Sequence, residues 1–202
     1  SGEAEYLEAT RAFRKMISEH KDRNTTCSRI QGVIDAGVVP FFVEFLGRDG
    51  NTELQLEAAW VLTNIASGTS DHTRAVIEAG ALPILVRLLQ SSPDIGVRGQ
   101  VLWALGNIAA DDAPAARAQA LDAGAMGPVL HHLAESSNNR ETRENAAWAL
   151  KNLCRKCADF EAVRAALPVL GTCLLANMAQ HDLHRARREW RERRTPLTTA
   201  QE

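Results

Sequence analysis

The sequence predicts an all-α protein built as a solenoid, in which three-helix repeats stack side by side around one continuous core. Two observations predict it. The segment WVLTNIA at Trp60 returns as WALGNIA at Trp103 and WALKNLC at Trp148, at intervals of 43 and 45 residues. A second segment, IDAGVVPFFVEFL, returns in the same phase as IEAGALPILVRLL and LDAGAMGPVLHHL. Two motifs that share one period are typical of repeat proteins, and apolar residues spaced by three and four indicate helices.

Each unit is predicted to contain a short helix, a middle helix and a long third helix. A glycine in the left-handed conformation is expected to end each short helix, and these glycines are Gly37, Gly80 and Gly124. A proline then fits the first turn of each middle helix, where its missing N–H is not needed, and these prolines are Pro40, Pro83 and Pro128. The long third helix follows and contains the Trp-x-x-x-Asn pattern.

The pattern divides the chain, a single domain over 1–202, into about four repeats and a degenerate fifth. The expected ranges are 6–33, 34–76, 77–120 and 121–165, with a C-terminal cap over 166–202. In the last unit Trp190 follows Trp148 by 42 residues, but Arg194 stands where Asn is expected. A third helix of this polarity cannot bury a face against a further repeat, and solenoid ends need a polar outer face.

The composition limits the class of protein. The chain has 202 residues, of which 45% are hydrophobic and 24% charged, enough to build a sizeable core. A formal net charge of -2 argues against a strongly basic nucleic-acid binder. No apolar run approaches the roughly eighteen residues of a membrane helix, and the polar start SGEAEYLEAT indicates no secretory signal. We therefore expect neither nucleic acid nor membrane as a partner.

No motif indicates an enzyme, a metal or a cofactor. The pair Cys154-x-x-Cys157 lacks the further ligands of a zinc site and the βαβ setting of a redox motif, so packed helical cysteines are favoured. The four cysteines follow no disulfide framework, which favours a reducing compartment. The chain has no G-x-S-x-G, P-loop or H-E-x-x-H sequence. We expect a protein without catalytic activity.

The Trp-x-x-x-Asn pattern predicts a binding surface. Residues four apart lie above one another on a helix, so adjacent third helices would form a ladder of three pairs across one concave face. The indoles provide flat walls for the stems and charges of Lys or Arg, and the carboxamides provide donors and acceptors for a peptide backbone. The pattern thus favours a short, extended, basic ligand. The alternative, that each Trp is core and each Asn a cap, is weakened by three repetitions in register.

These residues resemble a known family. WVLTNIASGTS, WALGNIAAD and WALKNLCR, each preceded by an AG-x-x-P-like segment, are similar to the first armadillo repeats of importin-α (karyopherin-α), the nuclear-import adaptor, from about Tyr6 to about Leu170. The resemblance implies an armadillo solenoid with a right-handed superhelix. It also implies binding of monopartite, Lys/Arg-rich nuclear-localisation signals, and a protein found in cytoplasm and nucleus.

The resemblance assigns roles to particular residues. It implies that the lysine pockets are walled by Trp60, Trp103 and Trp148, and that the peptide backbone is held by Asn64, Asn107 and Asn152. The deepest lysine pocket is expected to be formed by Gly68, Thr73 and Asp111, with Asp111 as the counter-charge. Secondary contacts are expected from Gln100 and Asn145.

The sequence also departs from the family. The basic importin-β-binding segment is missing, so importin-β is an expected partner only if the native protein has that segment. About ten repeats are usual, and the pattern here stops near the fifth. A generic armadillo scaffold remains an alternative, although such scaffolds usually line the groove with Lys and Arg. Another is a shortened adaptor that sequesters cargo, or whose basic tail at 185–194 binds the groove itself.

Overall fold

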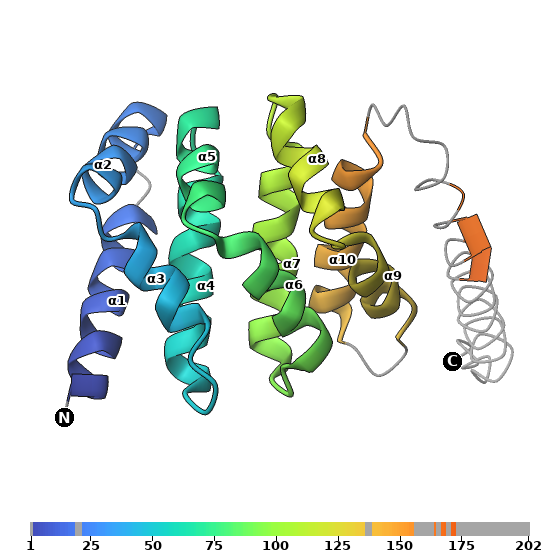
Figure 1. Cartoon of the computed structure of the whole chain (residues 1–202), viewed down its shortest axis with the longest axis horizontal. Coiled ribbons are helices and arrows are strands. Elements are labelled where there is room, and N and C mark those ends of the chain that lie inside the picture. Colours follow the sequence, from blue (N-terminus) through green and yellow to red (C-terminus); the bar gives the residue numbers. More distant parts are fainter. Residues whose placement is uncertain are drawn as a thin grey trace, which may run out of the picture.

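The computed structural model describes residues 2–18, 22–135 and 139–155, and further on residues 164, 167–168 and 171–172. Within these residues the chain forms ten helices and no strand. The helices are arranged in one elongated row from the N-terminus to α10 (Figure 1). The predicted α-solenoid is confirmed. Apart from residues 167–168 and 171–172, the expected C-terminal cap over 166–202 and its basic tail lie outside the described residues.

Four long helices form one layer of the row. They are α1 (Gly2–Ser18), α4 (Thr52–Ala66), α7 (Ile95–Ala110) and α10 (Arg140–Leu153), and each packs on the next in that order. The shorter helices cover this layer on the side nearer the viewer in Figure 1. They are α2 (Arg23–Asp35), α3 (Val39–Leu46), α5 (Ser70–Glu78), α6 (Ala81–Ser91), α8 (Pro114–Asp122) and α9 (Met126–Ala134).

The ends of these helices follow from local sequence. Gly37, Gly80 and Gly124 have φ values of 69°, 84° and 83°, in the left-handed region that ends a helix without strain only for glycine. Each long helix of the repeats begins at a side-chain cap that accepts a hydrogen bond from a backbone N–H three residues on, and these caps are Asn51, Asp94 and Asn139. Such a cap stabilises a helix by about 1 kcal/mol.

Core packing fixes which way the long helices face. The residue two positions after each tryptophan is a leucine that is almost fully buried: Leu62 and Leu105 at 0% exposure and Leu150 at 3%. Burial of such a side chain is worth about 1.5–3 kcal/mol. Because two residues along a helix turn through about 200°, the tryptophans point away from the core that the leucines fill.

The expected repeat boundaries lie within helices of the structure rather than between them. Boundaries at 34, 77 and 121 fall inside the short helices α2, α5 and α8, whereas the long helices α4 and α7 end at Ala66 and Ala110. The units therefore divide in the loops after the long helices. The period was visible in the sequence, but it does not fix where one period begins.

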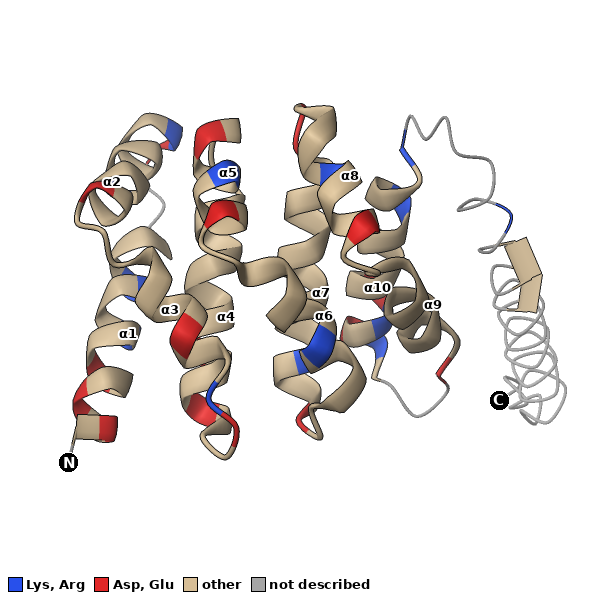
Figure 2. Cartoon of the chain, in the orientation of Figure 1, with Lys and Arg blue, Asp and Glu red and all other residues tan. Residues whose placement is uncertain are grey.

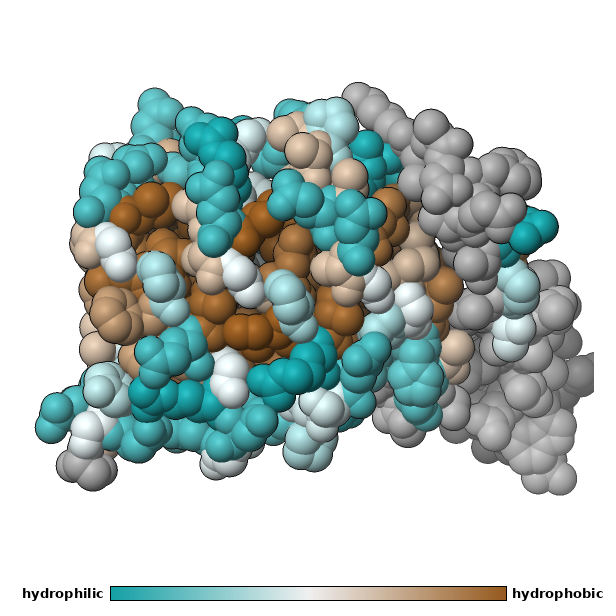
Figure 3. All heavy atoms as spheres, viewed as in Figure 1, coloured by the Kyte–Doolittle hydropathy of each residue, from teal (hydrophilic) through white to brown (hydrophobic). Residues whose placement is uncertain are grey.

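The outer layer has mixed charge and apolar furrows. Acidic and basic residues alternate along α5 (Figure 2), where Arg74 pairs with Asp71 at 2.9 Å and with Glu78 at 3.7 Å. Apolar side chains show between the helices along the middle of this face, flanked by hydrophilic residues (Figure 3). Among the described helices, none has the length and apolarity to cross a membrane. The same residues contain no cluster of three or more His, Cys, Asp or Glu that could hold a metal.

Candidate functional site

The structure places the three predicted tryptophans on adjacent long helices, outside the core. Trp103 on α7 and Trp148 on α10 are 44% and 39% exposed, and Trp60 on α4 is half-buried. The indole of Trp148 lies against Gly106 of the preceding long helix, where an added Cβ would be 2.3 Å from its Cδ1 atom. An indole therefore spans the gap between two long helices and forms a wall rather than a free surface side chain.

The three asparagines each use one N–H inside the protein. Asn64 donates to the Ser18 hydroxyl at 2.8 Å, and Asn107 donates to the Thr63 carbonyl oxygen at 3.1 Å. Both are partly exposed, and each carboxamide also has an oxygen and a second N–H that can form further hydrogen bonds. Asn152 differs, since it is only 3% exposed and donates to the Trp148 carbonyl oxygen of its own helix at 3.1 Å.

Gln100 and Asn145 connect the long helices. Gln100 donates to the Thr63 hydroxyl of α4 at 2.8 Å, and Asn145 donates to the Gly99 carbonyl oxygen of α7 at 3.1 Å. Gln100 is 9% exposed. These bonds hold α4 to α7 and α7 to α10 in fixed register, which sets the spacing of the tryptophans and asparagines.

Gly68 and Asp111 line one cavity with Asn107. The cavity has a volume of about 410 Å³ and lies between the C-terminal ends of α4 and α7. Helix α7 ends at Ala110, and Asp111 is its C-cap. Its carboxylate accepts a hydrogen bond from the Ala113 N–H at 2.8 Å. Asp111 and its neighbour Asp112 make this cavity acidic, although Arg23 also lines it.

Thr73 supports the cavity from behind. It is 1% exposed, and its hydroxyl donates to the Ala66 carbonyl oxygen at 3.3 Å. His72, 3% exposed, lies under Gly68, where an added Cβ would be 2.2 Å from the His72 Nδ1 atom. That atom accepts a hydrogen bond from the Thr69 N–H at 3.2 Å. Burial lowers the pKa of His72, so the neutral ring that this bond requires is favoured.

Arg155 holds the end of α7 from the next unit. One of its terminal nitrogens donates to the carbonyl oxygens of Ala110 at 2.5 Å and Asp111 at 3.1 Å. Arg155 thereby satisfies two carbonyl groups that a helix end leaves without intrahelical partners. Arg155 thereby holds the backbone at Ala110 and Asp111, which positions the Asp111 side chain.

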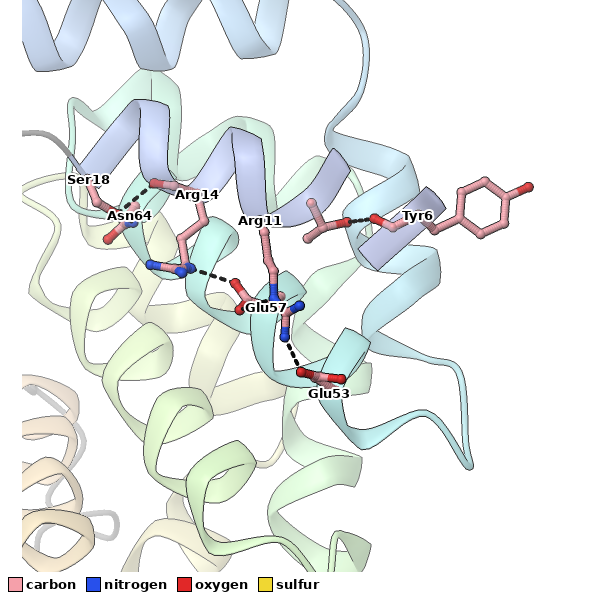
Figure 4. Close-up of polar contacts among 8 residues, drawn as sticks. Tyr6, Arg11, Arg14, Ser18, Glu53, Glu57 and Asn64 are labelled. Carbon is pink, nitrogen blue, oxygen red and sulfur yellow. Dashed lines mark hydrogen bonds and ion pairs between the residues drawn. The ribbon is translucent and has the colours of Figure 1, made fainter. Parts of the chain in front are cut away.

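The first Trp–Asn pair is in contact with α1. The Arg14 guanidinium carbon lies 4.4 Å from the centre of the Trp60 ring. Glu57, three residues before Trp60, accepts hydrogen bonds from Arg14 at 2.5 Å and from Arg11 at 3.1 Å. Figure 4 shows both arginines reaching from α1 toward Glu57, and Ser18 beside Asn64.

Sequence reasoning did not find Arg14, Ser18, Thr63 or Arg155. Each acts on a residue 37 to 46 positions away in the chain. Such contacts depend on the register between helices, which no local motif encodes. The one available signal was the spacing of Arg11 and Arg14, three residues apart on one helix face.

Two candidate features lie partly or wholly outside the described residues. Cys154 is the C-cap of α10, and Cys157, the other cysteine of the C-x-x-C pair, is not among the described residues. The same holds for the basic tail at 185–194, which was considered as an occupant of the groove.

Comparison with known proteins identifies the repeats. The armadillo/β-catenin-like repeat family matches residues 30–67, 69–110 and 114–155. "Importin subunit alpha-2" of Arabidopsis thaliana is 51% identical over 166 residues, which cover 81% of this chain and 30% of that protein. "Importin subunit alpha-1" of Schizosaccharomyces pombe is 52% identical over 167 residues, which cover 81% of this chain and 29% of that protein. The chain is thus importin-α-like and spans about 30% of the length of these relatives.

Solved structures show the same architecture. The crystal structure of an engineered protein matches with a TM-score of 0.69 at 34% identity, over 82% of this chain and 63% of that one. A designed armadillo repeat protein in complex with the peptide (KR)4 matches with a TM-score of 0.67 at 28% identity, over 80% of this chain and 62% of that one. The armadillo solenoid expected from the sequence is confirmed.

Proposed function

This chain belongs to the family of armadillo/β-catenin-like repeat proteins, and on that premise we propose that it binds basic nuclear-localisation signals as part of a nuclear-import adaptor. The ligand lies as an extended peptide along the surface formed by Trp60/Asn64, Trp103/Asn107 and Trp148/Asn152, hereafter the Trp–Asn ladder. The adaptor acts in cytoplasm and nucleus, and importin-β is a partner only if the native protein has the basic importin-β-binding segment. The proposed function has no catalytic step.

One observation carries the proposal: two partly exposed carboxamides alternate with indole walls along adjacent helices. Asn64 and Asn107 are each fixed by one internal hydrogen bond at 2.8 and 3.1 Å, so their remaining polar atoms are already oriented before a ligand arrives. Preorganised groups lose little side-chain entropy on binding. The two carboxamides can pair with a peptide backbone of any sequence. Specificity then comes from the slots between the indoles, which accept the ligand side chains.

Charge selects the ligand. Asp111 lines the same cavity as Asn107, so a cationic side chain that enters this cavity meets a carboxylate. Cation–π contacts contribute about 0.5–2 kcal/mol each, depending on how far the cation is desolvated. The importin-α relatives and the designed protein in complex with (KR)4 support a basic ligand. A scaffold for acidic partners needs a basic groove, which these residues do not provide.

Fluorescence titration tests the proposal. A labelled six-residue lysine-rich peptide is expected to bind at micromolar concentrations or tighter, to weaken with added salt, and to lose binding when its lysines are replaced by alanine. Trp103→Ala should weaken binding at least tenfold, because hot-spot aromatic residues typically contribute 2 kcal/mol or more. The matched control is Phe41→Ala, a 55% exposed aromatic residue on the outer helix α3. Equal binding by all three proteins would overturn the proposal.

A further inference from the structure

The face of Trp60 toward α1 already has a cation. The Arg14 guanidinium carbon is 4.4 Å from the centre of the indole, inside the roughly 6 Å limit for a cation–π contact. This is the contact that the proposed function assigns to a ligand lysine or arginine at each tryptophan. Here a residue of the same chain makes it.

Arg14 is anchored in that position. Its Nε atom donates to Glu57 at 2.5 Å, and its side chain is 18% exposed against 11% for that of Glu57. Arg11 donates to the other oxygen of Glu57 at 3.1 Å and also pairs with Glu53. Removing one partner from a largely buried pair leaves an uncompensated charge, so such pairs resist displacement. A ligand cation at Trp60 would therefore compete with Arg11 and Arg14 for the Glu57 carboxylate.

Helix α1 also contacts the polar half of this pair. Ser18 accepts the hydrogen bond from Asn64 at 2.8 Å. The first Trp–Asn pair is therefore contacted by α1 at its indole and at its carboxamide. The nearby carboxylate of Glu57 is paired as well, and Figure 4 shows the contacts of Glu57 and Asn64 with α1.

The other two tryptophans are different. The indole of Trp103 is 44% exposed. Within residues 2–18, 22–135 and 139–155, no Lys or Arg side chain makes a cation–π contact with it. Over Trp148 the ammonium of Lys151 lies 5.4 Å from the ring centre, but this lysine is exposed and lacks an ion pair within the described part of the chain. A flexible surface lysine is easily displaced, whereas Arg14 is held by Glu57.

We propose that Arg14 acts as a built-in occupant of the Trp60 cation site and so sets where the basic run of a ligand ends. This inference rests on the function proposed above. Cationic ligand residues bind at Trp103 and Trp148, and the ligand residue that reaches the α1 side of Trp60 gains nothing from a positive charge. A neutral or acidic residue is preferred there, because the remaining N–H groups of Arg14 can donate to a carboxylate.

Peptides with a single varied end residue test this inference. The common part is the six-residue lysine-rich peptide, extended by one Lys, Ala or Glu at its N-terminus or at its C-terminus. With the unaltered protein, one of the two ends should prefer Glu or Ala over Lys by about three- to fivefold, as expected for a single partly exposed charge contact. The other end, which lies toward α10, should not show this preference.

Two variants separate the role of Arg14 from general charge. Arg14→Gln frees the indole face and leaves Glu57 with only Arg11, so the preference against Lys at the sensitive end should disappear or reverse. Arg14→Met, which keeps an unbranched apolar stem over the indole, should also remove it. Arg11→Gln is the matched control, because it removes the same charge from α1 and from Glu57 but leaves Arg14 on Trp60. It should keep the preference. Circular dichroism confirms that each variant is folded.

The outcomes distinguish the two proposals. If the common peptide binds in a Trp103-dependent way but Arg14→Gln and Arg14→Met keep the end preference of the unaltered protein, the role of Arg14 is overturned and the proposed function stands. If Arg11→Gln abolishes the preference as fully as Arg14→Gln, the effect belongs to net charge and the inference also fails. If no peptide binds to the unaltered protein, the proposed function is overturned and this inference with it.

Discussion

Asp111 combines two roles at one position, since its side chain caps a turn and its charge faces a cavity. The carboxylate accepts the Ala113 N–H at 2.8 Å and lines the cavity with Asn107 and Gly68. An asparagine keeps the acceptor and removes the charge, whereas a lysine removes both and adds a cation. The two substitutions therefore separate the structural role from the electrostatic one.

Asp111→Lys is expected to weaken binding of the lysine-rich peptide by about 2 kcal/mol or more, because it places a cation where the ligand cation binds. Asp111→Asn should cost about 1 kcal/mol, with little change in thermal stability. Asp112→Asn is the neighbouring control, since its side chain is 99% exposed and is expected to matter less. Peptide titrations measure all three. Full affinity in Asp111→Lys would remove Asp111 from the site.

His72 makes the stability of the cavity wall depend on pH. Burial lowers the pKa of both His72 and His132 below the ordinary value of 6.5. The unfolded chain therefore binds protons more readily than the folded chain as pH falls through about 6.5, so the free energy of unfolding is greatest above that pH and decreases below it. Protonation of His72 would also remove the acceptor for the Thr69 N–H.

Urea denaturation at pH 7.5, 6.5 and 5.5 is expected to give a falling free energy of unfolding. The variant His72→Asn, whose Oδ1 atom replaces Nδ1 as the acceptor near the backbone, should show a smaller decrease. A free energy of unfolding that stays constant or rises from pH 7.5 to 5.5 would contradict this account of His72.

The long helices were predictable as elements, but their mutual contacts were not. The repeat period and the left-handed glycines are local signals, and the glycines lie at the helix ends expected of them. The N-caps Asn51, Asp94 and Asn139 are also local, but the structure revealed them. The hydrogen bond from Gln100 to Thr63 joins residues 37 positions apart. Its existence depends on how far α7 slides along α4, which packing of the whole layer decides. The Trp-x-x-x-Asn motif also did not indicate that α1, which has no tryptophan, contacts the first Trp–Asn pair, Trp60 and Asn64.

Two glycines of α7 show how the helices approach one another. An added Cβ at Gly106 would lie 2.3 Å from the Trp148 ring, too close for any side chain, whereas at Gly99 the nearest atom is the Thr142 hydroxyl oxygen at 3.6 Å. Neither glycine has a positive φ. A methyl group at Gly106 must push the Trp148 indole away, while one at Gly99 makes an ordinary contact.

Gly106→Ala is expected to destabilise the protein by about 1–3 kcal/mol, the usual cost of overpacking, and to shift the tryptophan fluorescence. It should also weaken peptide binding, because the Trp148 wall moves. Gly99→Ala is the control on the same helix and should stabilise by up to about 1 kcal/mol through helix propensity. Guanidinium denaturation measures both. Equal stability of the two variants would mean that the Trp148 indole relaxes without cost.

At the scale of the whole molecule, the repeat places the Trp–Asn pairs at regular intervals along the row of long helices. Each long helix packs on the next in the order α1, α4, α7, α10, so each Trp–Asn pair is offset from the last by one interhelix distance. That distance is about 8–10 Å for packed helices. An extended peptide advances about 3.3 Å per residue, so each pair corresponds to roughly three ligand residues, and the ladder from α4 to α10 spans about 20 Å or six residues.

This spacing predicts how affinity depends on ligand length. In a series of peptides of four, six, eight and ten residues with the same number of lysines, affinity should rise up to about six residues and then level off. Constant charge removes the electrostatic contribution of added length, so the increase reports backbone contacts with Asn64 and Asn107. Asn107→Ala should weaken every peptide of the series, since Asn107 lies on α7, the middle one of the three helices that form the ladder. Isothermal titration calorimetry measures the series. Affinity that ignores length at constant charge would indicate attraction without a register, and affinity that still rises at ten residues would mean that the binding surface extends past the ladder.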